Sequence, residues 1–225
     1  SISIIQSALK GKKMDLVVRQ ATECGVDEIL LAESVRAVLK TNGLAYLAAE
    51  ERTGKTLAAI LAIESLRSVS RVLVLTKKNA LKGWNDTLAA YKHSKVYHVT
   101  NYHQAHKLSD HYDLIVLDEA HNYISSFPKP SKLNKLLRPI TYCKPILYIS
   151  ATPHAQGFTQ LFNQFILSSY GPWRTYKTFY QWFRDYGKPY QIEINGIMIN
   201  QYDRVHEDKI LADVEHLFIT KTRQE

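Results

Sequence analysis

Five short apolar segments alternate with polar stretches along the first two thirds of the chain. They cover residues 43–49, 71–76, 96–100, 113–118 and 145–150. Apolar centres without alternation are typical of strands that are buried on both faces, as in parallel sheets. Because helical patterns separate most of these segments, the chain is predicted to have an α/β fold with a parallel sheet flanked by helices.

Two of the intervening stretches have helical spacing. Residues 54–66 form the first, and residues 79–91 form the second, in which Leu81, Trp84 and Leu88 fall on one apolar stripe. The last 50 residues differ in character. They contain an aromatic, helix-like stretch at 173–186, a helix-like stretch at 208–216 and a short final strand at 217–221.

A hairpin is predicted within this C-terminal part. The apolar runs 190–194 and 197–202 flank Asn195-Gly196, a dipeptide that favours the tightest hairpin turns. The hairpin is interpreted as an excursion from the main sheet.

The first residues are predicted to form a small α/β unit of their own, residues 1–38, followed by the main domain, residues 39–225. The pattern in the small unit favours a strand at 1–9, a helix at 14–24 and a second strand at 27–32.

Composition narrows the classes of function. Twenty-nine Lys and Arg against 21 Asp and Glu give a net charge of +8, which favours a polyanionic partner. The longest apolar runs, such as 57–63, fall short of the roughly 20 residues that cross a bilayer, so no membrane partner is expected. Two cysteines are too few for a disulfide framework or a zinc site and favour a reducing, cytoplasmic setting. Cys143, just before a predicted strand, is expected to be buried.

The strongest chemical signal is the segment 49–56, Ala-Glu-Glu-Arg-Thr-Gly-Lys-Thr, which follows a predicted strand and opens a predicted helix. Backbone N–H groups at such a helix start can bind phosphates. Gly54 would let the backbone approach closely, Lys55 would reach the β- and γ-phosphates, and Thr56 would offer its hydroxyl to Mg²⁺. Nucleotide binding is therefore assigned to Glu51, Arg52, Thr53, Gly54, Lys55 and Thr56. Ala49 stands where the usual first glycine of this motif would be, so the pattern is met only in part.

The second signal is a pair of acids, Asp118 and Glu119, at the end of the apolar strand 114–117. Carboxylates at that position are unfavourable unless they meet water or a cation, and ligands of open α/β sheets bind at that edge. Asp118 would hold Mg²⁺, and Glu119 would orient and deprotonate an attacking water. Acids at a solvated strand end are the alternative.

The third signal is Ser150-Ala151-Thr152-Pro153, again at the end of an apolar strand. The short hydroxyls of Ser150 and Thr152 could bond to the acids of a neighbouring strand. An ordinary turn is the alternative explanation for these residues taken alone.

In this order, the three motifs resemble those of the first RecA-like domain of superfamily 2 helicases and translocases, and most of all its Swi/Snf-like, phage-type branch. Asp118-Glu119-Ala120-His121 is similar to the family's DEAH box, and Ser150-Ala151-Thr152 to its third motif. The segments 72–84 and 100–102 support the resemblance, which covers residues 39–225.

The resemblance implies an ATP hydrolase that uses Mg²⁺ and acts on DNA, or RNA, in a bacterial or phage-infected cell. Lys55 and Glu119 would be catalytic, and Thr56 and Asp118 would hold the metal. His121, Ser150 and Thr152 would couple the nucleotide site to nucleic acid. The residues implied to face the nucleic-acid backbone are Thr76, Lys77, Lys78, Asn101 and Tyr102.

Two departures from the family pattern matter. The family has a glutamine-containing adenine-recognition segment shortly before the phosphate loop, and Gln20 lies too far upstream of Lys55 to match it. The family's second RecA-like domain, with its arginine fingers, has no counterpart in this sequence. Since an arginine finger contributes about 10³–10⁵ in rate, this domain alone is expected to bind nucleotide weakly and to hydrolyse it slowly, and a second RecA-like domain is an expected partner.

Residues 1–38 carry a different resemblance. The segments 6–15, 19–26 and 33–36 are similar to an internal piece of the knotted, SPOUT-class small-subunit ribosomal RNA uridine methyltransferases. That family binds S-adenosylmethionine in a later glycine-rich segment that has no match here. The join near residues 37–40 is interpreted as a fusion of two unrelated sequences, and a natural N-terminal extension is the alternative.

Two other functions therefore stay open: a fragment of a ribosomal RNA methyltransferase, and a nucleic-acid-binding module without turnover. Two further patterns have two interpretations each. Lys129, Lys132, Lys135 and Arg138 could follow a phosphate backbone or form a solvated helix face. The aromatic and basic residues of 173–186 could stack on single strands or fill a core.

Overall fold

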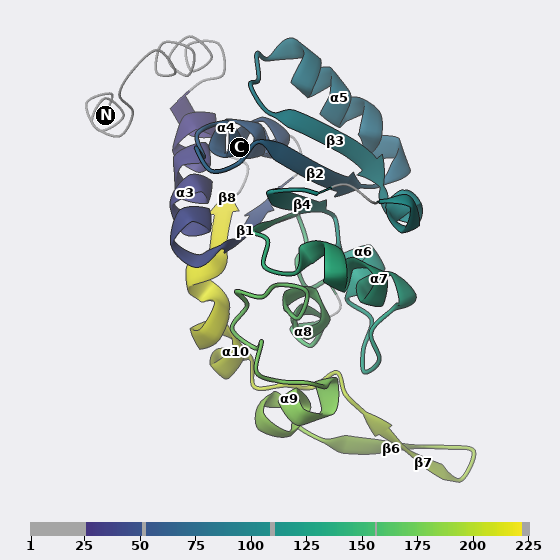
Figure 1. Ribbon diagram of the computed structural model, residues 1–225. Helices are drawn as coiled ribbons and strands as arrows, with labels where there is room; N and C mark the ends of the chain where they lie inside the picture. Colours follow the sequence, from purple (N-terminus) through teal and green to yellow (C-terminus); the bar gives the residue numbers. More distant parts are fainter. Residues whose placement is uncertain (1–25, 51–52, 109–110, 156, 222–225) are drawn as a thin grey trace.

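A parallel sheet of six strands forms the centre of the computed structural model, which describes residues 26–50, 53–108, 111–155 and 157–221 (Figure 1). The strand order is β3-β2-β4-β5-β1-β8, and every neighbouring pair is parallel. The strands are β1 (Leu44–Ala49), β2 (Arg71–Thr76), β3 (Val96–Asn101), β4 (Leu114–Asp118), β5 (Ile146–Ser150) and β8 (Phe218–Lys221). The α/β fold and its parallel sheet are confirmed.

Helices cover both faces of this sheet. One face is covered by α3 (Val26–Asn42), α4 (Lys55–Glu64) and α5 (Leu81–Ala90), the last preceded by the 3₁₀ turn η1 (Lys78–Ala80). The opposite face is covered by η2 (Tyr102–Lys107), α6 (His121–Ile124), α7 (Lys132–Thr141), α8 (Gln160–Phe165), α9 (Phe179–Tyr186) and α10 (Glu207–Val214). The short turn η3 (Glu215–Leu217) leads from α10 into β8.

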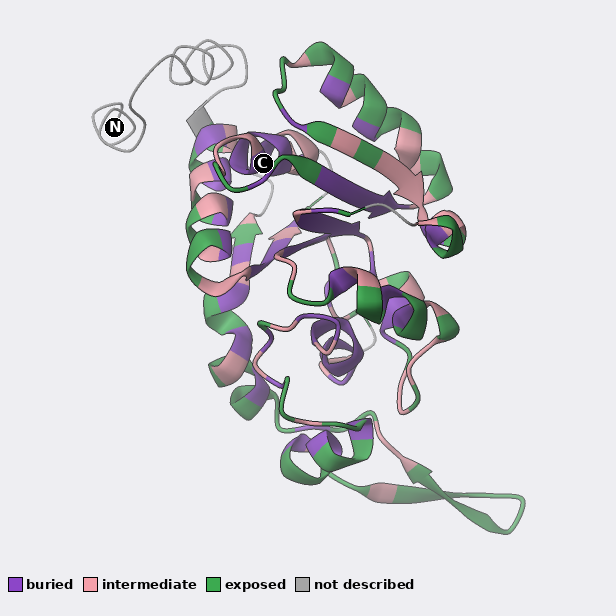
Figure 2. Ribbon diagram, viewed as in Figure 1, coloured by how far each residue is buried: buried purple, intermediate pink, exposed green. Residues whose placement is uncertain are grey.

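Alternation along each strand divides the core into two clusters. Along β1, Ala45 and Leu47 pack beneath the α3–α4–α5 layer, whereas Leu44 and Tyr46 face the other layer. Successive side chains of a strand point to opposite faces, so a strand with both faces covered is apolar throughout. Figure 2 shows this as burial along most of β2 and along β4.

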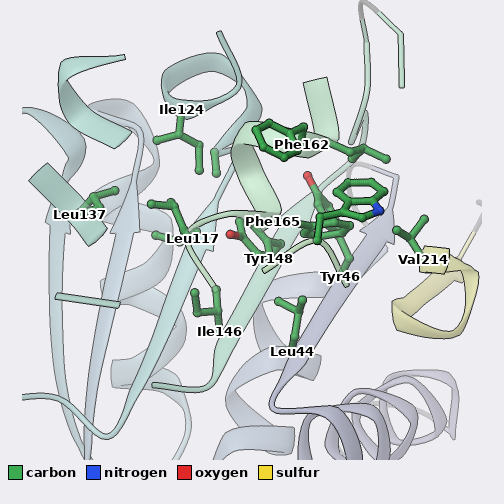
Figure 3. Packing of buried hydrophobic residues seen from close by; sticks show 14 of the residues in the cluster. Leu44, Tyr46, Leu117, Ile124, Leu137, Ile146, Tyr148, Phe162, Phe165 and Val214 are labelled. Atoms are coloured by element: carbon green, nitrogen blue, oxygen red, sulfur yellow. The ribbon is translucent and has the colours of Figure 1, made fainter. Parts of the chain in front are cut away.

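The second layer is rich in aromatic rings (Figure 3). Tyr46 of β1 stacks on Tyr148 of β5 with ring centroids 5.2 Å apart, and Phe165 of α8 meets both rings edge-on. Farther out, Trp173 and Trp182 meet at 5.2 Å. Aromatic pairs of this kind contribute beyond the area that they bury. Most aromatic side chains of the stretch 173–186 thus pack in a core, as one of its two interpretations predicts, rather than being free to stack on single strands. Tyr180 of this stretch is exposed.

An antiparallel hairpin of β6 (Tyr190–Ile194) and β7 (Ile197–Gln201) extends away from the sheet (Figure 1). Asn195 and Gly196 both have positive φ, 52° and 79°. That combination defines the turn that Asn-Gly favours, because its twist matches that of the flanking strands. The predicted hairpin is confirmed.

Several local predictions were wrong. Residues 27–32 belong to helix α3 rather than to a strand, because their apolar side chains pack on α4 and β1. Helix α9 begins at Phe179, six residues later than predicted. Cys143 is exposed, on a turn with φ 53°. The predicted strand 1–9 and helix 14–24 lie outside the described residues.

Helix α3 runs without a break through residues 38 and 39, where the sequence pattern changes. It contacts α4 and β1 and contributes Val35 and Leu39 to the core. The division into residues 1–38 and 39–225 therefore stays a prediction from sequence resemblance. No helix in the described part of the chain is long and apolar enough to cross a membrane.

Candidate nucleotide-binding site

Four strands end at the same edge of the sheet and bring the motif residues together. Because β2, β4, β5 and β1 are parallel neighbours, their carboxyl ends align. The chain leaves them through Lys77, Glu119, Ala151 and Glu50 respectively. In open α/β sheets this edge is where ligands bind.

The turn that opens α4 has the geometry of an anion-binding helix start. Gly54 is its N-cap, with φ 75° and ψ 16°, in the left-handed region that favours glycine. A Cβ on Gly54 would lie 2.8 Å from Cγ of Glu28, so the Glu28 side chain would have to shift to admit one. Thr53 is buried, and its hydroxyl donates to the carbonyl of Glu50 at 2.7 Å. Lys55 and Thr56 follow in the first helical turn, whose N–H groups have no partner within the helix. Glu51 and Arg52 lie outside the described residues.

Glu119 meets this turn directly. Nζ of Lys55 donates to Oε1 of Glu119 at 3.0 Å, and the hydroxyl of Ser150 donates to Oε2 at 3.0 Å. The backbone of Glu119 has φ 53°, while its N–H still donates to the carbonyl of Ile149 at 2.7 Å. Such strained backbone persists where surrounding bonds hold it, and it is common at functional sites. Burial by itself would raise the pKa of Glu119, but the hydrogen bond and charge of Lys55, with the Ser150 hydroxyl, lower it below its ordinary value.

His121 completes a network with Ser150. Nδ1 of His121 lies 3.0 Å from Oγ of Ser150, and the N–H of Thr152 donates to the same oxygen at 3.0 Å. Burial lowers the pKa of His121, and the charges of Lys77 and Lys55 add to that effect against the opposing pull of Glu119. While the Ser150 hydroxyl donates its proton to Glu119, its oxygen can accept a hydrogen bond from Nδ1 of a neutral His121. The expected coupling residues are thus in contact with one another.

Asp118 is more buried than Glu119. Oδ2 of this carboxylate accepts from the hydroxyl of Thr76 at 2.6 Å and from Nε1 of Trp84 at 2.9 Å. Its backbone carbonyl accepts from the hydroxyl of Tyr102 at 2.9 Å. Burial raises the pKa of Asp118, although the bonds from Thr76 and Trp84 oppose the rise.

These contacts correct two expectations. Thr76 and Tyr102 were expected to face nucleic acid, but both are buried and bonded to Asp118. The other members of that set are accessible: Lys78 is exposed, and Lys77 and Asn101 are partly exposed. Asn101 caps η2, because its side-chain oxygen accepts from the N–H of His103 at 3.0 Å.

A cavity of about 450 Å³ opens between α4, α5 and the end of β4. It is lined by Lys55, Thr56, Lys77, Asn79, Ala80, Gly83, Trp84, Thr87, Asp118 and Glu119. The wall contributed by α5 was not predicted as part of the site. Trp84 was placed on the buried stripe of its helix, and helical spacing gives no signal for the partner of an indole N–H.

The lining fits Mg²⁺ held together with phosphates. The hydrogen bonds that the Asp118 side chain accepts from described residues go to Oδ2, so Oδ1 is the oxygen left for a cation. Thr56, which carries a hydroxyl, lines the same cavity as Asp118. Within the described ranges no cluster of three or more His, Cys, Asp or Glu could hold a metal alone. Mg²⁺ typically binds one or two carboxylates and completes its shell with water and phosphate oxygens.

The basic residues of α7 and the segment before it, Lys129, Lys132, Lys135 and Arg138, are exposed. Their exposure is compatible with both interpretations, a solvated face and a phosphate track.

The fold resembles that of two solved SWI2/SNF2 ATPase core structures. The SWI2/SNF2 ATPase core of Sulfolobus solfataricus in complex with dsDNA is similar with a TM-score of 0.66 at 17% identity, over 88% of this chain and 44% of that one. The SWI2/SNF2 ATPase core domain of the same organism gives a TM-score of 0.63 at 15% identity, over 88% and 43%. The chain therefore spans less than half the length of these structures, and the likeness shows an α/β fold of the RecA-like type.

Sequence comparison gives a different result. No curated protein matches the chain. A family model described as an RNA methyltransferase domain matches residues 1–137, which extends well beyond the 38 residues whose likeness to methyltransferases was expected. From residue 26 on, the described part of this match includes strands β1 to β4 of the parallel sheet. Since the match covers more than half of the 225 residues, the chain belongs to the RNA methyltransferase domain family.

Proposed function

We propose that this chain is the ATP-binding half of a nucleic-acid-dependent ATPase of the helicase and translocase type. The observation that carries the proposal is the pairing of Lys55 with Glu119 at 3.0 Å, next to Asp118, at the carboxyl edge of the sheet. A cation at a helix start and two acids at the end of a neighbouring strand are the groups that phosphoryl transfer from a nucleoside triphosphate needs.

Each group has a role in that reaction. The N–H groups at the start of α4 and the ammonium of Lys55 would bind the β- and γ-phosphates. Thr56 and Asp118 would hold Mg²⁺, which when bound neutralises charge on the phosphates. Glu119 would orient a water for attack on the γ-phosphorus and accept its proton, giving ADP and inorganic phosphate. Gly54 supports the close approach of phosphates to the backbone, and Thr53 ties the turn to Glu50.

Nucleic acid is the proposed partner on the same edge of the sheet. The net charge of +8 and the accessible Lys77 and Lys78 support it. So does the dsDNA bound in the similar SWI2/SNF2 structure. His121, Ser150 and Thr152 would couple the two ligands, because their network ends on Glu119.

Full turnover is proposed to need a second RecA-like domain. The similar structures are more than twice as long as the part that this chain matches. An arginine supplied from a second domain is worth about 10³–10⁵ in rate. For the first domain by itself, binding of nucleotide is therefore a more direct test than turnover.

RNA methylation is the second candidate, and the family match over residues 1–137 favours it. A methyltransferase would bind S-adenosylmethionine, so two titrations of the same chain separate the candidates. By calorimetry, a non-hydrolysable ATP analogue with Mg²⁺ is expected to bind, and S-adenosylmethionine is not. Binding of S-adenosylmethionine with no binding of the analogue would overturn the ATPase proposal.

A further inference from the structure

Asp118 is bonded by three side chains, and each belongs to a segment that leads to the accessible edge of the sheet. Thr76 directly precedes Lys77, and Tyr102 directly follows Asn101. Trp84 lies on α5, the helix that continues from Lys78 through η1. The residue proposed to hold Mg²⁺ is therefore connected to both segments proposed to meet nucleic acid.

The geometry also fixes the direction of the carboxylate. Two donors, at 2.6 Å and 2.9 Å, converge on Oδ2 of Asp118 from β2 and from α5. The two oxygens of a carboxylate are rigidly linked, so holding Oδ2 also sets the position of Oδ1. Hydrogen bonds to a charged group are worth about 1.5–3 kcal/mol each, enough to select one orientation of the side chain.

Helix α5 and the turn η1 before it form a wall of the cavity. Asn79, Ala80, Gly83 and Thr87 line the cavity together with Trp84. Lys77 and Lys78 lie at the start of the same segment, where phosphates of a nucleic acid would attract them. A small shift of η1 and α5 toward a bound backbone would therefore carry the indole N–H with it.

We propose that Thr76 and Trp84 are positioning residues that transmit nucleic-acid binding at Lys77 and Lys78 to the metal-holding carboxylate of Asp118. This inference rests on the proposed ATPase function. It adds a route to the metal ligand, distinct from the network of His121, Ser150 and Thr152, which ends on Glu119.

The chain offers a matched control for the indole. Trp173, like Trp84, is buried and donates its Nε1 to an aspartate, in this case to Oδ2 of Asp213 at 3.0 Å. Asp213 lies on α10, and Trp173 packs in the aromatic cluster rather than against the cavity. Trp84→Phe and Trp173→Phe thus remove equivalent bonds at different places.

The test is a calorimetric titration of Mg²⁺ into the chain saturated with a non-hydrolysable ATP analogue, with and without a short DNA duplex. Trp84→Phe and Thr76→Val should weaken Mg²⁺ binding about 10-fold and abolish the change that DNA causes in the parent. Trp173→Phe and the conservative Thr76→Ser should behave like the parent. A melting curve of each variant verifies folding, and Thr76→Val carries the test if Trp84→Phe does not fold.

The outcomes separate the inference from the function on which it rests. If the parent binds Mg²⁺ with the analogue but Trp84→Phe and Thr76→Val bind it equally well, positioning is overturned while the ATPase proposal stands. An equal loss in Trp173→Phe overturns it as well, because the effect would then be one of general stability. If DNA leaves Mg²⁺ binding of the parent unchanged, the transmission is overturned. If the parent does not bind the analogue, the ATPase proposal fails and the inference with it.

Discussion

The ammonium of Lys55 lies 3.0 Å from Oε1 of Glu119, so the two residues proposed to act on the γ-phosphate are bonded to each other. Both side chains are largely buried, which makes an unpaired charge at either position unfavourable. Phosphates entering the site would compete with Glu119 for Lys55. The hydrogen bond from the Ser150 hydroxyl to Oε2 would keep Glu119 in place while Oε1 of the same carboxylate bonded to a water.

Glu119→Gln should separate binding from chemistry. Removing the negative charge frees Lys55 for phosphate, so the ATP analogue should bind as tightly as to the parent or more tightly. Loss of the general base should slow release of phosphate about 10²–10⁴-fold. Long single-turnover incubations with labelled ATP measure the rate, and calorimetry measures the binding.

The matched control for that variant is Glu33→Gln, which breaks the ion pair between Glu33 and Arg36 on α3. It should leave both quantities unchanged. Phosphate release from Glu119→Gln at the rate of the parent would contradict the role of Glu119 as base.

Gly54→Ala should destabilise the turn that opens α4. A left-handed backbone is unfavourable for alanine by about 1–2 kcal/mol, and the added Cβ would meet Glu28 at 2.8 Å. The midpoint of thermal unfolding should fall by about 2–4 °C for each kcal/mol in a chain of this length. Binding of the ATP analogue should weaken in parallel.

Gly83→Ala is the opposite case, measured in the same way. Gly83 lies within α5, and a Cβ there would meet nothing within 4 Å. Alanine in a helix interior is better than glycine by about 1 kcal/mol, so this variant should unfold at a higher temperature than the parent. A stabilising Gly54→Ala would show that the left-handed turn is not required.

Much of the sheet could be predicted because its signals are local. An apolar run such as Val72–Leu75 must be buried on both faces, and Asn195-Gly196 allows one kind of turn. The segment Ile29-Leu30-Leu31-Ala32 is short and apolar as well, and its helical state depends on contacts with α4 and β1. Local pattern could not distinguish these two outcomes.

The residues of the candidate site that lie at strand and helix ends could be predicted from the sequence. The buried hydrogen bonds that hold them could not. Asp118 and Ser150 end the apolar strands β4 and β5, and Lys55 opens the helix after β1; parallel neighbours align such positions. That the hydroxyl of Thr76 and the indole of Trp84 both bond to Asp118 depends on how β2 and α5 sit in three dimensions. Tyr102 is buried as well, whereas the family resemblance implied that it faces nucleic acid.

Asp118→Asn should raise stability at neutral pH while removing Mg²⁺-dependent binding of the analogue. Burial raises the pKa of Asp118, so the folded chain binds a proton there more readily than the unfolded chain. The ionised carboxylate therefore lowers the free energy of unfolding at pH values above its folded pKa. The asparagine oxygen can still accept from Thr76 and Trp84.

The difference in stability between Asp118→Asn and the parent should shrink as the pH falls toward 4. Asp118 of the parent is then protonated and carries no charge, as in the variant. Thermal melts at pH 7.5, 5.5 and 4.5 measure this difference. A variant less stable than the parent at pH 7.5 would contradict the account of Asp118 as a buried charge held for function.

His121 should make stability depend on pH in a higher range. Burial, with the charges of Lys77 and Lys55, lowers the pKa of His121 in the folded chain. The unfolded chain, with a histidine pKa near 6.5, therefore binds the proton first, and stability falls as the pH drops through that value. His121→Asn should flatten this part of the pH profile of urea unfolding, and an unchanged slope between pH 7.5 and 5.5 would contradict it.

The central claim, that Lys55 binds the phosphates of a nucleotide, is tested most directly by titrating an ATP analogue with Mg²⁺ into the parent, Lys55→Ala and Lys82→Ala. Lys82 is an exposed lysine paired with Asp86 on α5, so its variant controls for loss of one charge and one ion pair. The account predicts binding to the parent and to Lys82→Ala, and at least a 10-fold loss in Lys55→Ala. Equal binding by all three proteins, or none by the parent, would contradict it.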